Sequence, residues 1–240
     1  MGHTNLFSRR AALRVLPAGI PALWTPGVMA EQLEITPRLT EGPFYPDKLP
    51  LDTDNDLLVI NDSIDPAVGQ VTHLTGKVLR RSGEPVRNAF VEIWQVDANG
   101  VYLHSGSNGA KGRDTNFQGY GRFLTDVNGR YYFRTIKPTT YPGRTPHIHF
   151  AVSMNGRRVM TSQILIEGHP QNERDGVFRT IRDSERRKLV TAKFNPIADS
   201  KLNELQARFN IVLGETPQED DQGVMRGGIG PSDRASNRRG

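Results

Sequence analysis

The feature that most constrains the fold is a series of short strand-like segments between residues 71 and 166. In these segments apolar residues alternate with polar ones or form short apolar runs, as buried strands do. Asn-Gly pairs at positions 99–100, 128–129 and 155–156 accept the positive φ angles of tight hairpins. This pattern predicts an all-β chain folded as an antiparallel β-sandwich with long loops. The expected strands cover residues 74–79, 89–96, 131–136, 148–153 and 159–166.

Outside this region the sequence predicts little regular structure. Residues 183–194 are expected to form one short helix, with Asp183 or Ser184 as its N-cap. Residues 216–240 hold few apolar side chains and several glycines, which predicts a disordered tail. With 240 residues, of which 36% are hydrophobic, the chain can build one sizeable core. We therefore expect a single folded domain over residues 31–215.

The first thirty residues have the pattern of an export signal. Arg9 and Arg10 precede a mostly apolar stretch over residues 15–28, and Val28-Met29-Ala30 resembles a small-x-Ala cleavage site. Adjacent arginines before such a stretch are typical of the twin-arginine route. Residues 1–30 are thus predicted to be a twin-arginine-type signal peptide that exports the protein to the periplasm or beyond, and a flexible basic terminus is the alternative. The apolar stretch is short and interrupted by three prolines, so no membrane span is expected.

Charge and composition exclude two classes of site. The net charge is +5, but three arginines lie in the first fourteen residues, and without them 28 basic residues face 26 acidic ones. No basic stripe interleaved with aromatic residues remains, so we expect no nucleic-acid partner. The chain contains no cysteine, which excludes disulfides and thiolate metal sites. Any metal must be held by His, Tyr, Asp, Glu or backbone groups.

The sharpest local feature is His147-Ile148-His149. Residues two apart on a strand share one face, so both imidazoles can address one point while Ile148 and Phe150 face the core. Such a pair is by itself more often a surface or hydrogen-bonding pair than a metal site. The preceding residues 141–146 contain two prolines and a glycine, which predict a bent connection able to bring Tyr141 toward the imidazoles.

These residues belong to a series of motifs that resembles the intradiol ring-cleavage dioxygenases, most closely their protocatechuate 3,4-dioxygenase branch. The resemblance covers most of residues 38–213. In order, the motifs are Leu39-Thr40-Glu41-Gly42-Pro43-Phe44-Tyr45, Val91-Glu92-Ile93-Trp94-Gln95-Val96-Asp97, Gly100-Val101-Tyr102-Leu103-His104, Asn116-Phe117-Gln118-Gly119-Tyr120-Gly121-Arg122-Phe123, and Phe133-Arg134-Thr135-Ile136-Lys137-Pro138 running through Tyr141-Pro142 to Phe150.

The resemblance implies a non-haem Fe(III) bound by four side chains and a hydroxide. The four ligands would be Tyr102, Tyr141, His147 and His149. Tyr141 and His149 would be axial, and Tyr141 would leave the metal when a catechol binds. The resemblance also identifies Arg144 and Gln163 as active-site residues that stabilise negative charge developing during the reaction.

The residue types agree with this chemistry. Phenolate oxygen is a hard anionic donor, so two tyrosines favour Fe(III) over Fe(II) and make zinc less suitable. The implied reaction uses O2 to cleave a catechol between its two hydroxylated carbons and yields a muconate-type diacid. His104, two residues after Tyr102, stays open as a supporting partner or an alternative ligand. The connection from Tyr141 to His147 is short and Leu165 replaces a frequent aromatic residue, which predicts a more open site and leaves the catechol undecided.

Two other hypotheses remain open at this point. Residues 83–91 and 125–133 also fit an exported, non-catalytic β-sandwich binding module with a prealbumin-like core. Such modules lack the set of two tyrosines and two histidines, so the presence of this set distinguishes a dioxygenase from a binding module. The third hypothesis is a His-x-His metalloenzyme of the cupin type, which needs a carboxylate and a later histidine as ligands. Only His169 follows the pair.

Overall fold

The computed structural model of the protein describes residues 32–61, 64–107, 112–214, 218–219 and 225–226. All of them belong to one of the two units into which the chain divides, that of residues 31–240. The predicted signal peptide and most of the predicted disordered tail lie outside the described residues, so both stay predictions. Within the tail, β11 (Gln218–Glu219) and β12 (Met225–Arg226) pair antiparallel, which the sequence did not predict.

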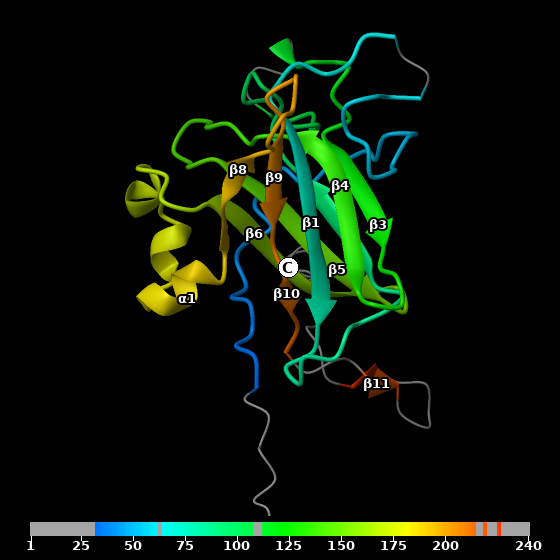
Figure 1. Ribbon diagram of the computed structural model, residues 1–240, viewed down its shortest axis with the longest axis vertical. Coiled ribbons are helices and arrows are strands. Elements are labelled where there is room, and N and C mark those ends of the chain that lie inside the picture. The colour runs from blue at the N-terminus through cyan, green and yellow to red at the C-terminus, as the bar shows by residue number, and fades with distance from the viewer. Residues whose placement is uncertain (1–31, 62–63, 108–111, 215–217, 220–224, 227–240) are drawn as a thin grey trace, which may run out of the picture. The chain divides into compact units, whose positions relative to one another are not determined.

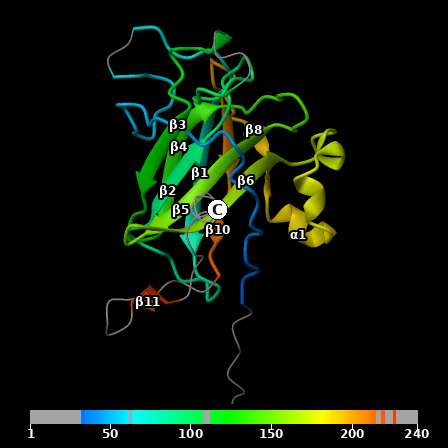
Figure 2. The same ribbon diagram turned by 180° about the vertical axis from the view of Figure 1, so that it is seen from behind.

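Among the described residues, ten strands form two five-stranded sheets, which face each other (Figure 1). The first sheet contains β1 (Val71–Leu79), β4 (Arg130–Ile136), β8 (Phe194–Pro196), β9 (Leu205–Arg208) and β10 (Ile211–Val212). The second, in spatial order, contains β3 (Tyr120–Leu124), β2 (Phe90–Trp94), β5 (His147–Met154), β6 (Arg157–Ile166) and β7 (Thr191–Ala192). Figure 2 shows the second sheet from its outer side.

The predicted β-sandwich is confirmed, although both sheets are mixed rather than purely antiparallel. Strand β1 pairs antiparallel with β4 and parallel with β9 and β10, and β7 runs parallel to β6. The core lies between the sheets, where Leu74 and Val78 of β1 pack in one cluster with Ile148 and Phe150 of β5. Alternate residues of β1 and β4 point outward, as period-two alternation requires.

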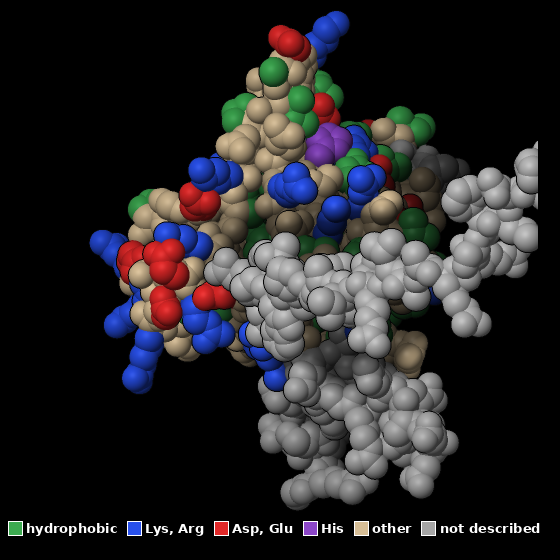
Figure 3. Space-filling view, turned by 60° about the horizontal axis from the view of Figure 1, so that its bottom comes forward, with side chains coloured by type: hydrophobic (Ala, Val, Ile, Leu, Met, Phe, Trp, Pro, Cys, Tyr) green, Lys and Arg blue, Asp and Glu red, His purple; other side chains and the backbone are tan. Residues whose placement is uncertain are grey.

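The outward face of the first sheet carries charge. Figure 3 shows several Lys and Arg side chains around a histidine, with others mixed with Asp and Glu side chains elsewhere in the same view. Some of these polar groups are paired: Arg134 Nη1 lies 2.8 Å from an oxygen of Asp56, and His73 Nε2 lies 3.4 Å from Glu204. Among the residues described, no helix is long and apolar enough to cross a bilayer.

Two of the three Asn-Gly pairs do not form the hairpins that the sequence indicated. The pair at Asn155 and Gly156 joins β5 to β6, with φ angles of 47° and 73°. The pair at positions 128–129 instead connects β3 to β4, which belong to different sheets. The pair at positions 99–100 closes a tight turn, after which the next strand begins only at Tyr120. Alternating apolar and polar residues on both sides of a turn do not indicate whether the second strand pairs within the same sheet as the first.

The predicted helix over residues 183–194 is much shorter. Helix α1 (Ser184–Lys188) is capped by Asp183, whose carboxylate accepts the backbone N–H groups of Glu185 and Arg186. The chain then becomes extended, since Leu165 N donates to Val190 O and β7 pairs with β6. Burial of this stretch against the second sheet outweighs its helical tendency. Two 3-10 turns, η2 (Asn172–Arg174) and η3 (Phe178–Thr180), lie between β6 and α1.

Candidate active site

The site lies on the outer face of the second sheet, on the side away from the sandwich core. Strand β5 alternates, so that Ile148 and Phe150 enter the core while His147 and His149 face outward. The register of the sheet places Trp94 of β2 and Gln163 of β6 directly beside His149. Both histidines are nevertheless buried, because other parts of the chain cover this face.

The cover comes from the N-terminal segment of the described chain and from the loop after β2. Ser162 Oγ donates to Pro37 O, and Gln163 Nε2 donates to Thr40 O, so residues 37–40 lie along β6. Figure 2 shows this blue segment running over the second sheet. A separate apolar cluster forms under the cover. It contains Trp94, Val96, Tyr102, Tyr120 and Ala151, with Phe44, Tyr45, Leu103 and Tyr141 packed against it.

Three polar atoms converge inside this cover. Tyr102 Oη lies 3.2 Å from His147 Nε2 and 3.0 Å from His149 Nε2, and the two imidazole nitrogens are 3.0 Å apart. None of the three residues is more than 2% exposed. The two-residue spacing of the histidines therefore does bring both rings to one point, as the sequence predicted.

The surroundings of His147 and His149 differ. His147 Nδ1 lies 2.7 Å from the carbonyl oxygen of Thr145. A proton on Nδ1 satisfies this contact and leaves the lone pair of Nε2 directed at Tyr102, which is how metal-binding histidines are commonly oriented. The ring of His149 is stacked on Trp94, with centroids 4.9 Å apart and planes 5° from parallel. Its Nδ1 is buried without a hydrogen-bond partner among the described residues.

Burial determines the protonation of the cluster. It lowers the pKa of His147 to about 3, with a further contribution from the charge of Arg144. Burial also lowers the pKa of His149 well below its ordinary value, and it raises the pKa of Tyr102 well above the ordinary value for a phenol. Both imidazoles are thus neutral and keep the lone pairs that bind metals. A phenolate at Tyr102 needs a cation beside it.

Tyr141, Arg144 and Gln163 form a second group that touches the first. The ring of Tyr141 meets that of Tyr102 edge to face, with centroids 5.3 Å apart. Arg144 Nη1 donates to Tyr141 Oη at 3.3 Å, and Nη2 donates to Gln163 Oε1 at 2.6 Å. Because Gln163 Nε2 donates to Thr40 O, its amide oxygen is turned toward the guanidinium. The structure therefore brings together all six side chains that the sequence singled out.

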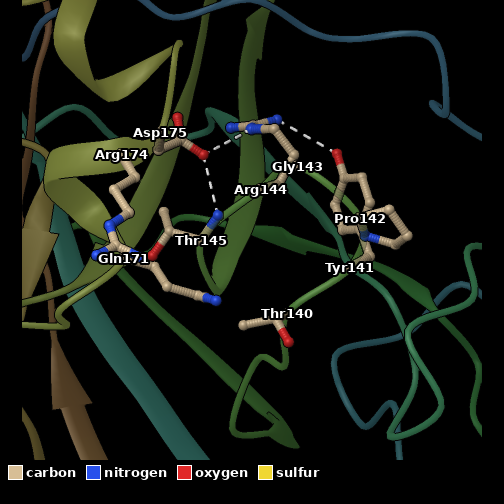
Figure 4. Close-up of a pocket in the computed structure, with 9 residues that line it drawn as sticks. All are labelled: Thr140, Tyr141, Pro142, Gly143, Arg144, Thr145, Gln171, Arg174 and Asp175. Atoms are coloured by element: carbon tan, nitrogen blue, oxygen red, sulfur yellow. Dashed lines mark hydrogen bonds and ion pairs between the residues drawn. The ribbon is translucent and has the colours of Figure 1, made fainter.

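A cavity of about 440 Å³ opens beside Tyr141 and Arg144. Figure 4 shows Tyr141 and Pro142 on one side of it, Gln171 and Arg174 on the other, and Arg144 with Asp175 between them. The lining residues are Thr140, Tyr141, Pro142, Gly143, Arg144, Thr145, Gln171, Arg174 and Asp175. The cavity gives a small molecule access to Tyr141, the partly exposed member of the two-tyrosine pair.

The other histidines of the described residues do not join this group. His104 Nδ1 accepts the backbone N–H of Gly106 at 2.9 Å, and its ring contacts Phe44, so it supports the loop of Tyr102 and does not join the three converging atoms. His169 Nδ1 lies 3.3 Å from Thr145 Oγ1. Across the described segments, no three His, Cys, Asp or Glu side chains gather as a metal site, so the cupin-type hypothesis gains no ligand set.

Sequence reasoning missed two contributors to the site. Phe44 stacks on Tyr102, with centroids 5.2 Å apart, and touches the edge of Tyr141. Phe44 lies in the first of the motifs that carry the family resemblance, but the resemblance assigned it no role in the site. Asp175 lines the cavity and pairs with Arg144 at 2.8 Å. No motif or periodicity marks it.

Comparison with known proteins agrees with this geometry. Residues 40–215 match the family model Dioxygenase_C, described as Dioxygenase. The chain is 37% identical over 164 residues to the protocatechuate 3,4-dioxygenase beta chain of Burkholderia cepacia, and the match covers 63% of this chain and 69% of that protein. It is 32% identical over 178 residues to catechol 1,2-dioxygenase 2 of Acinetobacter lwoffii, covering 64% of this chain and 62% of that one. The chain thus spans less than two thirds of the second relative.

A solved structure has the same fold. It is the dioxygenase domain of a dioxygenase carbohydrate-binding protein fusion from the cellulolytic bacterium Streptomyces sp. SirexAA-E, with a TM-score of 0.57 and 27% identity. The match covers 76% of this chain and all of that domain. Since the family model spans well over half of the chain, the reading as a non-catalytic binding module is set aside. The chain belongs to the intradiol ring-cleavage dioxygenases and is an oxidoreductase of the dioxygenase class.

Proposed function

We propose that this protein is an Fe(III)-dependent intradiol dioxygenase, which uses O2 to cleave catechols between the two hydroxylated carbons and forms muconate-type diacids. The observation that carries the proposal is the convergence of Tyr102 Oη, His147 Nε2 and His149 Nε2 within 3.2 Å of one another in a buried site.

The donor set fits ferric iron. Tyr102, Tyr141, His147 and His149 would hold the metal, because two phenol oxygens and two neutral imidazole nitrogens suit ferric iron. Burial raises the pKa of Tyr102, so a phenolate there would require a strong positive charge beside it, and the metal would supply that charge. Bound there, ferric iron would act as a Lewis acid that makes the catechol ring reactive toward O2.

The chain's own residues would bind the catechol and handle its protons. Tyr141 lines the cavity, so its phenolate oxygen can accept a proton from an entering catechol hydroxyl. The guanidinium of Arg144 is fixed between Tyr141 and Gln163, where it places positive charge beside the ring that becomes negative. Phe44 and Trp94 cover the tyrosine and histidine rings and keep water from this part of the site.

Iron content, colour and product together test this function. Protein loaded with Fe(III) should absorb visible light through charge transfer from phenolate to iron. It should also consume O2 with catechol or protocatechuate and release a muconate-type diacid, measured with an oxygen electrode and by mass spectrometry. A colourless protein that holds stoichiometric zinc contradicts the iron assignment. Products of cleavage beside the two hydroxyl groups contradict the reaction.

The cavity also suggests how the substrate is selected. We infer that Arg174 binds an acidic ring substituent, because its exposed side chain lines the cavity opposite Tyr141 (Figure 4) and, in the part of the chain described, no acidic side chain forms an ion pair with it. The change Arg174→Gln should raise KM for protocatechuate about 10-fold, corresponding to one charge-assisted hydrogen bond of about 1.4 kcal/mol. Steady-state kinetics should show KM for unsubstituted catechol changing less than about twofold.

Arg179→Gln is the matched control for this experiment. Arg179 is also exposed and lies in η3, but it does not line the cavity. Its replacement should leave KM for both substrates unchanged. An equal rise of KM for catechol and protocatechuate in Arg174→Gln contradicts the assignment.

A further inference from the structure

Two buried side chains of the segment after β6 hold the turn that leads into the histidine strand. Thr145 Oγ1 donates to Asn172 Oδ1 at 2.7 Å, and Thr145 N donates to Asp175 Oδ2 at 3.0 Å. Asn172 is itself anchored, since its Nδ2 donates to Ile166 O. Thr145 is thus fixed through both its backbone and its side chain, and its carbonyl oxygen is the partner of His147 Nδ1.

Asp175 is the central residue of this arrangement. Its side chain is 0% exposed, and both of its carboxylate oxygens accept hydrogen bonds from other groups of the chain. Oδ2 accepts Arg144 Nε at 2.8 Å as well as Thr145 N, and Oδ1 accepts the N–H groups of Val177 and Phe178, each at 2.9 Å. Burial alone raises the pKa of Asp175, but these backbone and guanidinium donors outweigh it and lower the pKa below the ordinary value. The carboxylate is therefore charged inside the fold.

The contact with Arg144 sets the direction of the guanidinium. A guanidinium is planar, so a hydrogen bond at Nε restricts where Nη1 and Nη2 can point. In this protein they point at Tyr141 Oη and Gln163 Oε1. Figure 4 shows Arg144 held between Asp175 on one side and Tyr141 on the other. Without the Nε contact, the same side chain has several other rotamers open to it.

We propose that Asp175 is a positioning residue, which acts by aiming the Arg144 guanidinium at the substrate side of Tyr141. The proposal rests on the proposed function, because the consequence of a misplaced Arg144 is a slower ring cleavage. It assigns a role to a residue whose carboxylate is hydrogen-bonded to Arg144 and to backbone N–H groups and not to the three converging donor atoms. Partners that orient groups of a metal site typically contribute about 10- to 100-fold to activity or affinity.

Asp175→Asn tests the proposal. The substitution keeps the shape and one acceptor oxygen, but it turns an NH2 group toward donors that need an acceptor. In iron-loaded protein with catechol, kcat and kcat/KM should fall together by about 10- to 100-fold, because an interaction made in the transition state is lost. In metal-free protein, the Nε–H signal of Arg144, assigned through Arg144→Lys, should lose its protection from solvent exchange in NMR spectra.

The double variant separates positioning from general damage to the fold. If Asp175 acts through Arg144, the variant Asp175→Asn with Arg144→Gln should be no slower than Arg144→Gln alone. Losses that multiply, or a kcat within twofold of wild type in Asp175→Asn, overturn the proposal. Asp126→Asn is the matched control, because Asp126 also accepts two backbone N–H groups in a turn, just after β3 and at the end of the sheet opposite to Trp94 and His149. It should retain wild-type kcat.

Should Asp175→Asn fail to fold, Asp175→Glu decides the question. Its carboxylate keeps the charge but lies one methylene further from the backbone, so Arg144 is displaced while the ion pair persists. A kcat at least fivefold below wild type, with the Nε–H signal shifted but still protected, supports the proposal. Wild-type kcat overturns it. Failure of the proposed function is recognised separately, because wild-type protein loaded with iron would then cleave no catechol.

Discussion

His149→Ala is expected to abolish iron binding and to lower kcat/KM for catechol by about 1,000-fold or more. The loss should exceed the 10- to 100-fold typical of outer partners, because the imidazole is one of the proposed ligands. His149 Nε2 lies 3.0 Å from both other converging atoms, so its removal leaves one side of the site without a donor. Metal analysis after dialysis against Fe(III), together with the visible spectrum, measures the loss.

The control for this experiment is His104→Ala. His104 is two residues after Tyr102, and its Nδ1 already accepts a hydrogen bond from the backbone N–H of Gly106. Its replacement should therefore retain stoichiometric iron and the visible band. Tyr102→Phe should behave differently from both, keeping some iron but bleaching part of the band because one phenolate is lost. Full iron content in His149→Ala, or loss of iron in His104→Ala, contradicts the assignment of ligands.

The ligand strand was predictable because its reasons are local. Alternation puts His147 and His149 on one face whatever the sheet around them, and the sequence predicted strand β5 to within one residue at each end. The grouping of Tyr102, Tyr141, Arg144 and Gln163 around them came from the series of motifs and not from spacing. Nothing in the alternation of β6 by itself places Gln163 beside His149.

The rest of the site depends on contacts that no local pattern encodes. Asp175 follows His149 by more than twenty residues in a segment of 3-10 turns, where neither period two nor period 3.6 applies. Its burial is a product of tertiary structure, so a lone aspartate before a glycine reads as an ordinary turn residue. The parallel pairing of β1 with β9 and β10 is likewise non-local, which is why an antiparallel sandwich was expected.

Gly76→Ala is expected to destabilise the fold by about 3 kcal/mol, the upper end of the roughly 1–3 kcal/mol that overpacking typically costs, because the clash is with backbone. Gly76 lies in the middle of β1, and a Cβ atom there would come within 1.7 Å of the carbonyl oxygen of Phe209. That carbonyl cannot move freely, since it accepts the hydroxyl of Tyr131 at 2.5 Å. The backbone of β1 or of residue 209 must therefore shift. Urea unfolding followed by fluorescence measures the change.

Gly112→Ala serves as the control, because a Cβ atom at Gly112 meets no atom of the described residues within 4 Å. It should change the free energy of unfolding by less than about 0.5 kcal/mol, as for most exposed positions. Equal stabilities of the two variants contradict the steric argument.

The position of Phe209 also affects the strand that carries the histidines. The ring of Phe209 packs on that of Phe150, with centroids 5.6 Å apart, and Phe150 follows His149 on the same strand. A displaced Phe209 should therefore weaken iron retention as well as stability, because it loosens the core side of the strand whose other face holds the histidines.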